Sequence, residues 1–184
     1  MKYMIASDLH GSVEYVSQLL AAWKREGADA LLLLGDMLYH GPRNALPEEY
    51  DTKQVFAMLN DLDGDIIAVR GNCDAEVDQW VLAFPMMADY EIVEYGTRKL
   101  FLTHGHLYDP IEKLPPIGAG DVMLSGHTHV PASFRNSDGV WFLNPGSVSI
   151  PKKGSPHSYM TLENDVFLWK TLDGEVYREL SLDD

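Results

Sequence analysis

The sequence predicts a protein of the α/β class, with residues 1–184 forming a single domain. From Tyr3 to Val69, short apolar runs alternate with amphipathic helical patterns, which is typical of βα units. After Ala75 the helical patterns fade and short strand-like runs follow one another. A hydrophobic content of 46% and a charged content of 23% are ordinary for a packed domain and exclude a disordered chain.

Three apolar runs in the N-terminal half predict buried strands: Tyr3–Ala6, Ala30–Leu34 and Ile66–Val69. Each is too short for a helix and is followed by polar or glycine residues, as expected of a strand that enters a turn. The run at Ala30–Leu34 is rich in leucine and does not alternate with polar residues. That pattern is typical of a strand in a sheet covered on both faces.

Two amphipathic patterns between these runs predict helices. The first lies between an N-cap at Ser12 and a stop at Gly27. The second follows Asp51, which with Gln54 resembles a capping box. Their apolar faces are Val16, Leu19, Leu20 and Trp23 in the first, and Val55, Phe56, Leu59 and Leu62 in the second.

The C-terminal part is predicted to be a series of short strands. These are Tyr90–Glu94, Lys99–Thr103, Val122–Ser125, Ser133–Arg135, Val140–Leu143, Tyr159–Leu162, Val166–Lys170 and Val176–Leu180. Turn-forming residues at Asn136–Gly139 and Asn164–Asp165 predict hairpins between neighbouring strands.

Charge and cysteine content narrow the partners and the compartment. With 14 basic against 28 acidic residues the net charge is −14, and no basic cluster is present, which argues against stable nucleic-acid binding and against attachment to an anionic membrane. No apolar run approaches the ~18 residues of a membrane span. The single cysteine excludes an internal disulfide and fits a reducing compartment, so we expect a cytoplasmic protein.

Five polar clusters each follow an apolar strand-like run. They are Asp8-Leu9-His10, Gly35-Asp36, Gly71-Asn72-Cys73-Asp74, His104-Gly105-His106 and Gly126-His127-Thr128-His129. Ligand sites in α/β sheets form at the carboxyl ends of strands, so clusters that are distant in sequence can meet there. Their carboxylates, imidazoles and amide are ligands for Mn²⁺, Fe²⁺, Zn²⁺ or Ni²⁺. The pattern therefore predicts a binuclear metal site.

Each cluster alone has an ordinary structural explanation. An Asp at a strand end, such as Asp8 or Asp36, is most often a turn residue or a helix cap. The His127 and His129 pair is about as often structural as ligating. Independent explanations do not predict that five clusters follow five strands, or that five of the 7 histidines lie within them. The combination favours a shared site.

In this order the clusters resemble the signature of the calcineurin-like metallophosphoesterases: Asp-x-His, Gly-Asp, Gly-Asn-His-Asp/Glu, His and Gly-His-x-His. The match runs from Asp8 to His129. The short chain, the loop His40-Gly41-Pro42-Arg43-Asn44 and the stretch Asn144–Ser147 make the chain most similar to the small bacterial phosphodiesterases of the YfcE type.

The resemblance implies a four-layer α/β/β/α sandwich of two mixed β-sheets flanked by helices, with a two-metal site along one edge. It implies that Asp36 bridges two divalent ions, of which Mn²⁺ is the first to test and Zn²⁺, Fe²⁺ or Ni²⁺ are alternatives. One ion would be held by Asp8, His10, Asp36 and His129, and the other by Asp36, Asn72, His104 and His127. A bridging hydroxide would then attack a phosphodiester in line.

One position departs from the family signature, because Cys73 replaces the usual histidine. In the family that histidine is held to stabilise the transition state or to protonate the leaving group. Cys73 is then either a weak proton donor or a small packed residue, and His106 is another candidate donor. A nucleophilic role for Cys73 is disfavoured, because Gln79 occupies the position where a Cys-x5-Arg phosphatase loop has arginine.

Three further residues are candidates near the site. Asp74 is expected either to orient a metal-bound water or an imidazole, or to cap the following segment. Arg43 and His40 lie in the loop of residues 37–50, which is long and has no periodicity, and loops of that length are usually functional. Both are expected to contact substrate, Arg43 through a phosphate oxygen, with an ordinary surface salt bridge as the alternative for Arg43.

The sequence thus predicts a metal-dependent phosphodiesterase for small-molecule substrates. A phosphomonoesterase of the same superfamily is the nearest alternative, and a nuclease is disfavoured by the low basic content. A different class, a protein-interaction scaffold on the same fold, is disfavoured because all seven metal-ligand positions are retained. Apolar loop residues would suit a homo-oligomer, but the sequence does not determine the oligomeric state.

Overall fold

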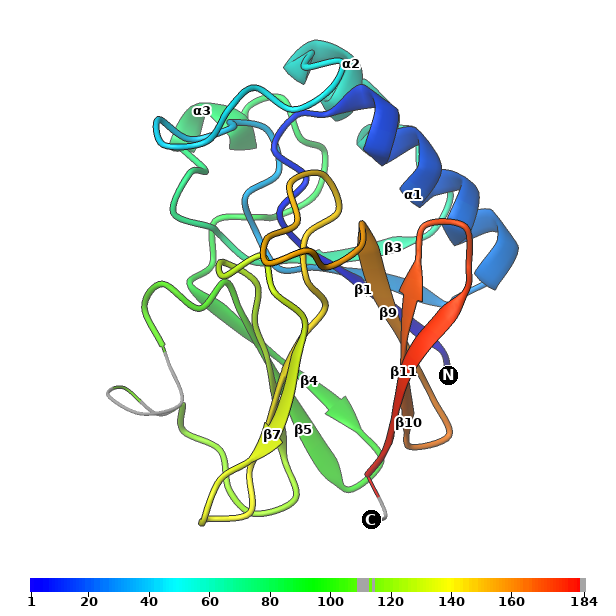
Figure 1. Cartoon of the computed structure of the whole chain (residues 1–184). Helices are drawn as coiled ribbons and strands as arrows, with labels where there is room; N and C mark the ends of the chain where they lie inside the picture. The colour runs from blue at the N-terminus through cyan, green and yellow to red at the C-terminus, as the bar shows by residue number, and fades with distance from the viewer. Residues whose placement is uncertain (109–112, 114, 183–184) are drawn as a thin grey trace.

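The computed structural model describes residues 1–108, 113 and 115–182, whose strands form two mixed β-sheets (Figure 1). The six-stranded sheet has the order β11-β10-β9-β1-β2-β3. Its strands are β1 (Tyr3–Ala6), β2 (Ala30–Leu33), β3 (Asp65–Ala68), β9 (Ser158–Glu163), β10 (Val166–Thr171) and β11 (Val176–Ser181). The five-stranded sheet has the order β4-β5-β6-β8-β7. Its strands are β4 (Tyr90–Tyr95), β5 (Arg98–Thr103), β6 (Val122–Leu124), β7 (Ala132–Arg135) and β8 (Trp141–Asn144).

The two sheets pack face to face through side chains that alternate along each strand. In β1, Tyr3 and Ile5 belong to the core between the sheets, where they join residues such as Leu102 of β5. Met4 and Ala6 point the other way, into the core beneath the helices. This period of two follows from strand geometry and explains why these strands are apolar on both faces.

The first helix begins and ends where the sequence predicts, whereas the second begins after its predicted cap but ends before Leu62, which was expected on its apolar face. In α1 (Val13–Glu26) the Ser12 side chain accepts a hydrogen bond from the Tyr15 N–H, and Gly27 ends the helix in the left-handed conformation. In α2 (Thr52–Asn60) the Asp51 carboxylate accepts from two backbone N–H groups. The Gln54 side-chain amide donates to that carboxylate, while the Asp51 N–H donates to the Gly11 carbonyl and not to Gln54, so the cap is one-sided and not a capping box.

A third helix, α3 (Glu76–Gln79), was not predicted. It is a single turn with no buried residue, and Val77 and the adjacent Trp80 are exposed. A helix without a buried face has no apolar periodicity, so the sequence gives no signal for it. The eight predicted C-terminal strands are all present, with ends shifted by one residue at most positions. Asn164 and Asp165 both have positive φ, as a tight hairpin turn requires.

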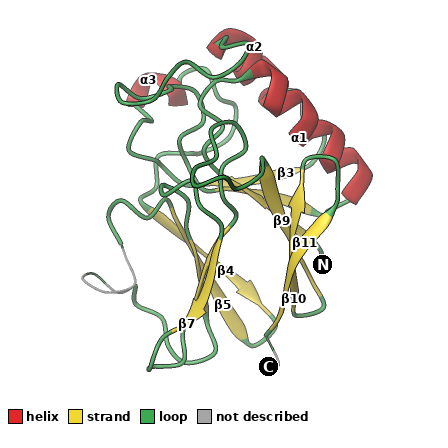
Figure 2. Ribbon diagram, viewed as in Figure 1, coloured by secondary structure: helices red, strands yellow, loops and turns green. Residues whose placement is uncertain are grey.

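The predicted α/β class with two mixed sheets is confirmed. Figure 2 shows that the helices lie on the side of the six-stranded sheet. On the outer face of the five-stranded sheet, Tyr108 and Ile117 pack against Phe101 and Phe142. Within the described residues, irregular segments rather than a helix cover this face. None of the described helices is both long and apolar enough to cross a membrane.

Parallel strands bring the polar clusters to one edge. β1, β2 and β3 run parallel to one another, and so do β5, β6 and β8. The five clusters follow β1, β2, β3, β5 and β6, and Asn144–Ser147 follows β8. Since the carboxyl ends of parallel strands share an edge, the topology places these segments together.

A charged cluster around Glu26 ties the end of α1 to the six-stranded sheet. The Glu26 carboxylate accepts hydrogen bonds from the ammonium groups of Lys2 and Lys170 and from the Tyr159 hydroxyl, at 2.6–2.9 Å. Burial opposes its charge, but the bonds from Lys2, Tyr159 and Lys170 outweigh burial and lower the pKa of Glu26 to about 2. The ionised carboxylate therefore stabilises the folded state.

We predict that Glu26→Gln lowers the free energy of unfolding by about 1–2 kcal/mol at pH 7, a value discounted for solvent screening. Because the folded pKa lies below the unfolded value of 4.5, this contribution is complete above pH 4.5 and is lost as the pH falls towards 2. Urea unfolding at several pH values measures it, with the exposed Glu163→Gln as control. A difference between wild type and Glu26→Gln that does not shrink on acidification would contradict the prediction.

Candidate metal centre

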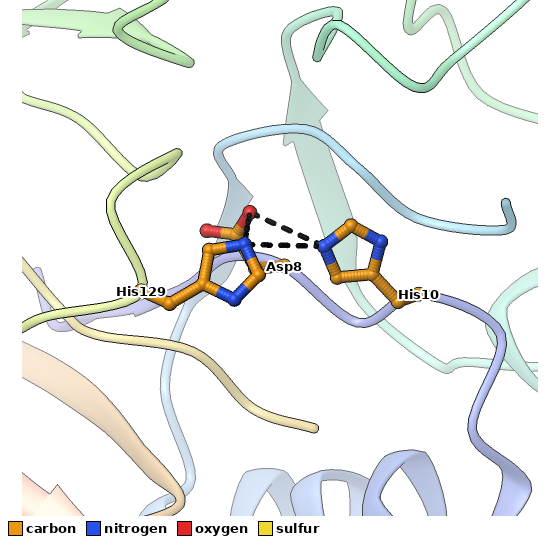
Figure 3. Close-up of side chains that lie close together, drawn as sticks. All are labelled: Asp8, His10 and His129. Carbon is orange, nitrogen blue, oxygen red and sulfur yellow. Dashed lines mark hydrogen bonds and ion pairs between the residues drawn. The ribbon is translucent and has the colours of Figure 1, made fainter. Parts of the chain in front are cut away.

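Two buried carboxylates and three imidazoles meet at the shared edge of the sheets. The Oδ1 atom of Asp8 lies 3.2 Å from His129 Nε2 and 3.6 Å from His10 Nε2 (Figure 3). The Oδ2 atom of Asp36 lies 3.3 Å from His104 Nε2 and 3.7 Å from His10 Nε2. His10 thus stands between the two carboxylates. Residues that are 119 positions apart in sequence, such as His10 and His129, are in direct contact, as the clusters predict.

The three imidazoles are held in one orientation by the backbone. The Nδ1 atoms of His10, His104 and His129 lie 2.7–2.8 Å from the carbonyl oxygens of Tyr39, Leu34 and Ile150. A carbonyl only accepts, so each Nδ1 carries a proton and donates it. In a neutral imidazole the lone pair then lies on Nε2, which points into the cluster. Metal-ligating histidines are typically oriented in this way.

The donor set fits a cation. Asp8 is fully buried, and its Oδ1 makes no hydrogen bond of good geometry with the described residues. Three Nε2 atoms nevertheless lie within 4.0 Å of it, from His129, His10 and His104. Buried polar atoms normally have a partner, and an oxygen facing imidazole nitrogens provides the ligands that divalent metals use. Asp8, His10 and His129 form one compact group, and Asp8, Asp36 and His104 form another.

Backbone strain is concentrated at the same residues. Nine non-glycine residues of the described chain have positive φ, and five of them are predicted metal ligands: Asp8, His10, Asp36, His127 and His129. Asp and His tolerate this region better than most residues, yet each such position costs roughly 1–3 kcal/mol. Surrounding bonds hold the strained loop, since the hydroxyls of Ser147 and Ser149 both donate to the Asp8 carbonyl. Strain of this kind clusters at functional sites.

Two glycines allow the loops to approach the carboxylates. A Cβ at Gly71 would collide with the carboxylate and the backbone nitrogen of Asp36. A Cβ at Gly126 would collide with the Ser7 hydroxyl and lie 2.7 Å from Asp8 Oδ2. Because Gly126 has no Cβ, the His127 N–H can approach the same Asp8 oxygen and donates to it at 3.0 Å. Both glycines are therefore required by close approach rather than by backbone conformation.

Asp74 positions the loops after β2 and β3. Its buried carboxylate accepts hydrogen bonds from the backbone N–H groups of Asp36, Met37 and Gly71, at 2.7–2.9 Å. Of the roles expected from the sequence, neither the helix cap nor the bond to an imidazole is seen. Its oxygens accept these backbone bonds, so Asp74 ties the two loops together.

Charge balance in the cluster shifts the pKa values of its histidines. Burial opposes protonation of His104, but its hydrogen bond to Asp36 and the charges of Asp8 and Asp36 outweigh burial and raise its pKa to about 9. Burial also opposes protonation of His10, and the bond to Asp8 overcomes it, so the pKa is raised. His127 has the opposite shift, because burial and the nearby His104 lower its pKa.

The remaining predicted ligands lie beside this cluster. Asn72 Oδ1 is 3.0 Å from His104 Nε2. The ring of His127 is centred 5.1 Å from that of His104. The structure therefore brings all seven predicted metal-ligand positions to one edge.

A cavity of about 830 Å³ opens onto the cluster. Asp36, Asn72, His127 and His129 line it, and so does Arg43, as the sequence predicts. His40 does not line it. Its half-buried ring packs edge-on against Tyr39 and Tyr50, so the structure does not support the expected substrate contact.

The cavity has lining residues that the sequence analysis missed, among them Lys152, Tyr39 and Thr128. Thr128 lies between two predicted ligands, His127 and His129, so its place in the motif indicated that it would lie at the site. Lys152 follows β8 by several residues and lies in no motif, so only the tertiary fold brings it to the site.

The two candidate proton donors have different surroundings. Cys73 lines the cavity, and its backbone N–H donates to Asp36 Oδ1 at 2.8 Å. Burial and the neighbouring carboxylates raise the pKa of its thiol to about 12. His106 is half-buried beside His104, with ring centres 5.4 Å apart, and burial together with His104 and His127 lowers its pKa to about 4. Neither group is a strong proton donor at neutral pH.

Comparisons with known proteins agree with this geometry. Residues 1–166 match the family model of the calcineurin-like phosphoesterase superfamily domain. The chain is 50% identical over 166 residues to phosphodiesterase YfcE of Escherichia coli, covering 90% of this chain and 89% of that protein. It is 30% identical over 174 residues to the probable metallophosphoesterase YsnB of Bacillus subtilis, covering 90% and 86%. A solved structure of E. coli YfcE, described as a phosphoesterase, has a TM-score of 0.94 at 46% identity and covers 99% of this chain and 100% of that one.

We predict that Asp74→Asn lowers the free energy of unfolding by about 1–3 kcal/mol, because at least one backbone N–H loses its acceptor. Displacement of the loops should also weaken Mn²⁺ binding by about 10-fold or more. Chemical unfolding and calorimetric Mn²⁺ titration measure the two effects. Asp138→Asn, in an exposed hairpin turn, is the control. Unchanged metal affinity in folded Asp74→Asn protein would argue against the positioning role.

Proposed function

The chain belongs to the calcineurin-like phosphoesterase superfamily, and from this premise we propose that it is a metal-dependent phosphodiesterase with a binuclear centre. Its substrates are small-molecule phosphodiesters, and residues 1–184 act as one catalytic domain. The observation that carries the proposal is the buried Asp8 Oδ1, which faces three imidazole nitrogens and has no well-formed hydrogen bond within the described chain. That arrangement is costly without a cation and favourable with one.

The proposed ligand sets follow the two sides of the cluster. Asp8, His10 and His129 would hold one divalent ion together with Asp36. Asp36, Asn72, His104 and His127 would hold the other, so that Asp36 bridges the pair. Mn²⁺ is the first metal to test, since carboxylate, imidazole and amide ligands suit it.

When bound, two such ions lower the pKa of water to near neutrality and neutralise charge on the phosphoryl oxygens. The chain supplies the rest. Asp74 and the strained loops hold Asp36 and Asp8 in place before substrate arrives. Arg43 and Lys152 line the cavity and are positioned to bind the phosphate oxygens of the substrate. Their positive charges oppose the repulsion between the anionic substrate and a chain whose net charge is −14.

Leaving-group preference follows from the weak proton donors. Cys73 stands where the family signature has histidine, and burial raises the pKa of its thiol, so the chain lacks the family's proton donor at this position. We propose that the enzyme favours leaving groups that depart as stable anions, such as aryl oxides.

A scaffold that only binds other proteins is the alternative from a different class. Such a protein gains nothing from five strained ligand positions or from two buried carboxylates. Those features destabilise a fold and persist where they serve a site. They favour catalysis over the scaffold.

We predict Mn²⁺-dependent hydrolysis of bis(4-nitrophenyl) phosphate that a chelator abolishes. In folded His127→Ala and Asn72→Ala protein the rate should fall by at least about 100-fold, because each removes a proposed ligand. Release of 4-nitrophenolate measures the rate, and His157→Gln, which lies outside the cluster, is the control. Equal rates with and without metal would exclude the proposed mechanism. Faster hydrolysis of 4-nitrophenyl phosphate than of the diester would favour a phosphomonoesterase.

We predict that Lys152→Gln and Arg43→Gln each raise KM by about 5- to 10-fold with little change in kcat, because each removes a charge-assisted contact to bound substrate. Steady-state kinetics measure both constants. Lys153→Gln is a matched control, since Lys153 is adjacent but does not line the cavity. A fall in kcat without a change in KM would instead mean that the Lys152 or Arg43 side chain contacts only the transition state.

A further inference from the structure

A second cavity of about 450 Å³ lies beside the one that opens onto the metal centre. The two cavities share three lining residues, Tyr39, Cys73 and Ala75. The volume lies within the range of small-molecule sites in proteins. The second cavity is therefore a neighbouring compartment of the site.

The two compartments differ in chemistry. The cavity at the metal centre is lined by Arg43, Asn72 and Lys152. The second is lined by Phe56, Val77 and other apolar side chains, together with Lys53 and Asp78, whose formal charges cancel. A charged group fits the first compartment, and an apolar group fits the second.

Cys73 connects the apolar compartment to the metal centre. Its backbone N–H donates to the Asp36 carboxylate at 2.8 Å, and Cys73 lines both compartments. A phosphoryl group held by the proposed ions at Asp36 would therefore lie next to the apolar compartment. A phosphodiester carries two ester groups on one phosphorus, so one of them can enter it while the other stays in the polar compartment.

We propose that this apolar compartment is a subsite for an aromatic ester group of the substrate. The inference rests on the proposed function and specifies its substrate class: phosphodiesters with at least one flat apolar substituent. Val77, Val81 and Phe56 are the specificity-determining side chains. Burial of an aromatic ring there, rather than any charged contact, supplies the preference.

A second copy of the chain is the other occupant to consider, because exposed apolar residues lie close by. Val77 is 54% exposed and Trp80 is 82% exposed. Trp80 does not line the compartment, whereas Val77 and Val81 do. Substitution of Trp80 therefore tests an interface, and substitution of the two valines tests the subsite.

The experiment compares diphenylphosphinate with dimethylphosphinate, two anions of the same charge that differ only in their substituents and whose P–C bonds are not hydrolysed. Their dissociation constants are measured by calorimetry on Mn²⁺-loaded protein, with dimethylphosphinate measured by displacement. We expect diphenylphosphinate to bind about 10-fold tighter or more, as burial of one ring implies. In Val77→Gln/Val81→Gln protein this preference should disappear while the affinity for dimethylphosphinate stays the same.

Trp80→Gln is the matched control and should keep the preference. Equal affinities for the two anions in wild-type protein would overturn the proposal. So would loss of the preference in Trp80→Gln together with a change in molecular mass by light scattering, which would assign the compartment to an interface between copies. Because binding is measured without turnover, these results stand apart from the proposed activity, which hydrolysis of methyl 4-nitrophenyl phosphate tests separately.

Discussion

Two carboxylates, Asp8 and Asp36, lie buried at the ends of neighbouring strands, and the arrangement of the surrounding loops follows from the need to balance their charge. An isolated buried carboxylate costs several kcal/mol. Here imidazole nitrogens surround both carboxylates, and backbone carbonyls fix the direction of each ring. Strained φ angles at five ligand positions are tolerated because hydrogen bonds from other loops hold them. Divalent cations fit such a site, and we propose that it holds a pair of them.

Most of the fold and the meeting of the polar clusters could be predicted because both leave local signals. Strands such as Tyr3–Ala6 are short apolar runs, and α1 has a clear helical period with recognisable caps. The clusters could be expected to meet because each follows a strand and parallel strands share an edge. This reasoning needs no distances, which is why it could bring Asp8 and His129 together although they lie 121 positions apart, without showing the geometry of their contact.

The details that the sequence did not indicate depend on tertiary contacts. His40 shares a loop with Arg43, yet the rings of Tyr39 and Tyr50 pack against it and keep it out of the cavity lining. Lys152 reaches the cavity although it lies in no motif. Asp74 is adjacent to the proposed ligand shell in sequence, but its oxygens bind backbone N–H groups of two loops. Side-chain direction decides each of these cases, and no periodic pattern encodes it.

The most direct measurement of the central claim is anomalous scattering from crystals of the protein grown with Mn²⁺. The account predicts two peaks that share Asp36, one beside Asp8, His10 and His129 and the other beside Asn72, His104 and His127. Absence of metal from this edge at saturating Mn²⁺, or a single ion that leaves Asp8 without a ligand contact, would contradict it.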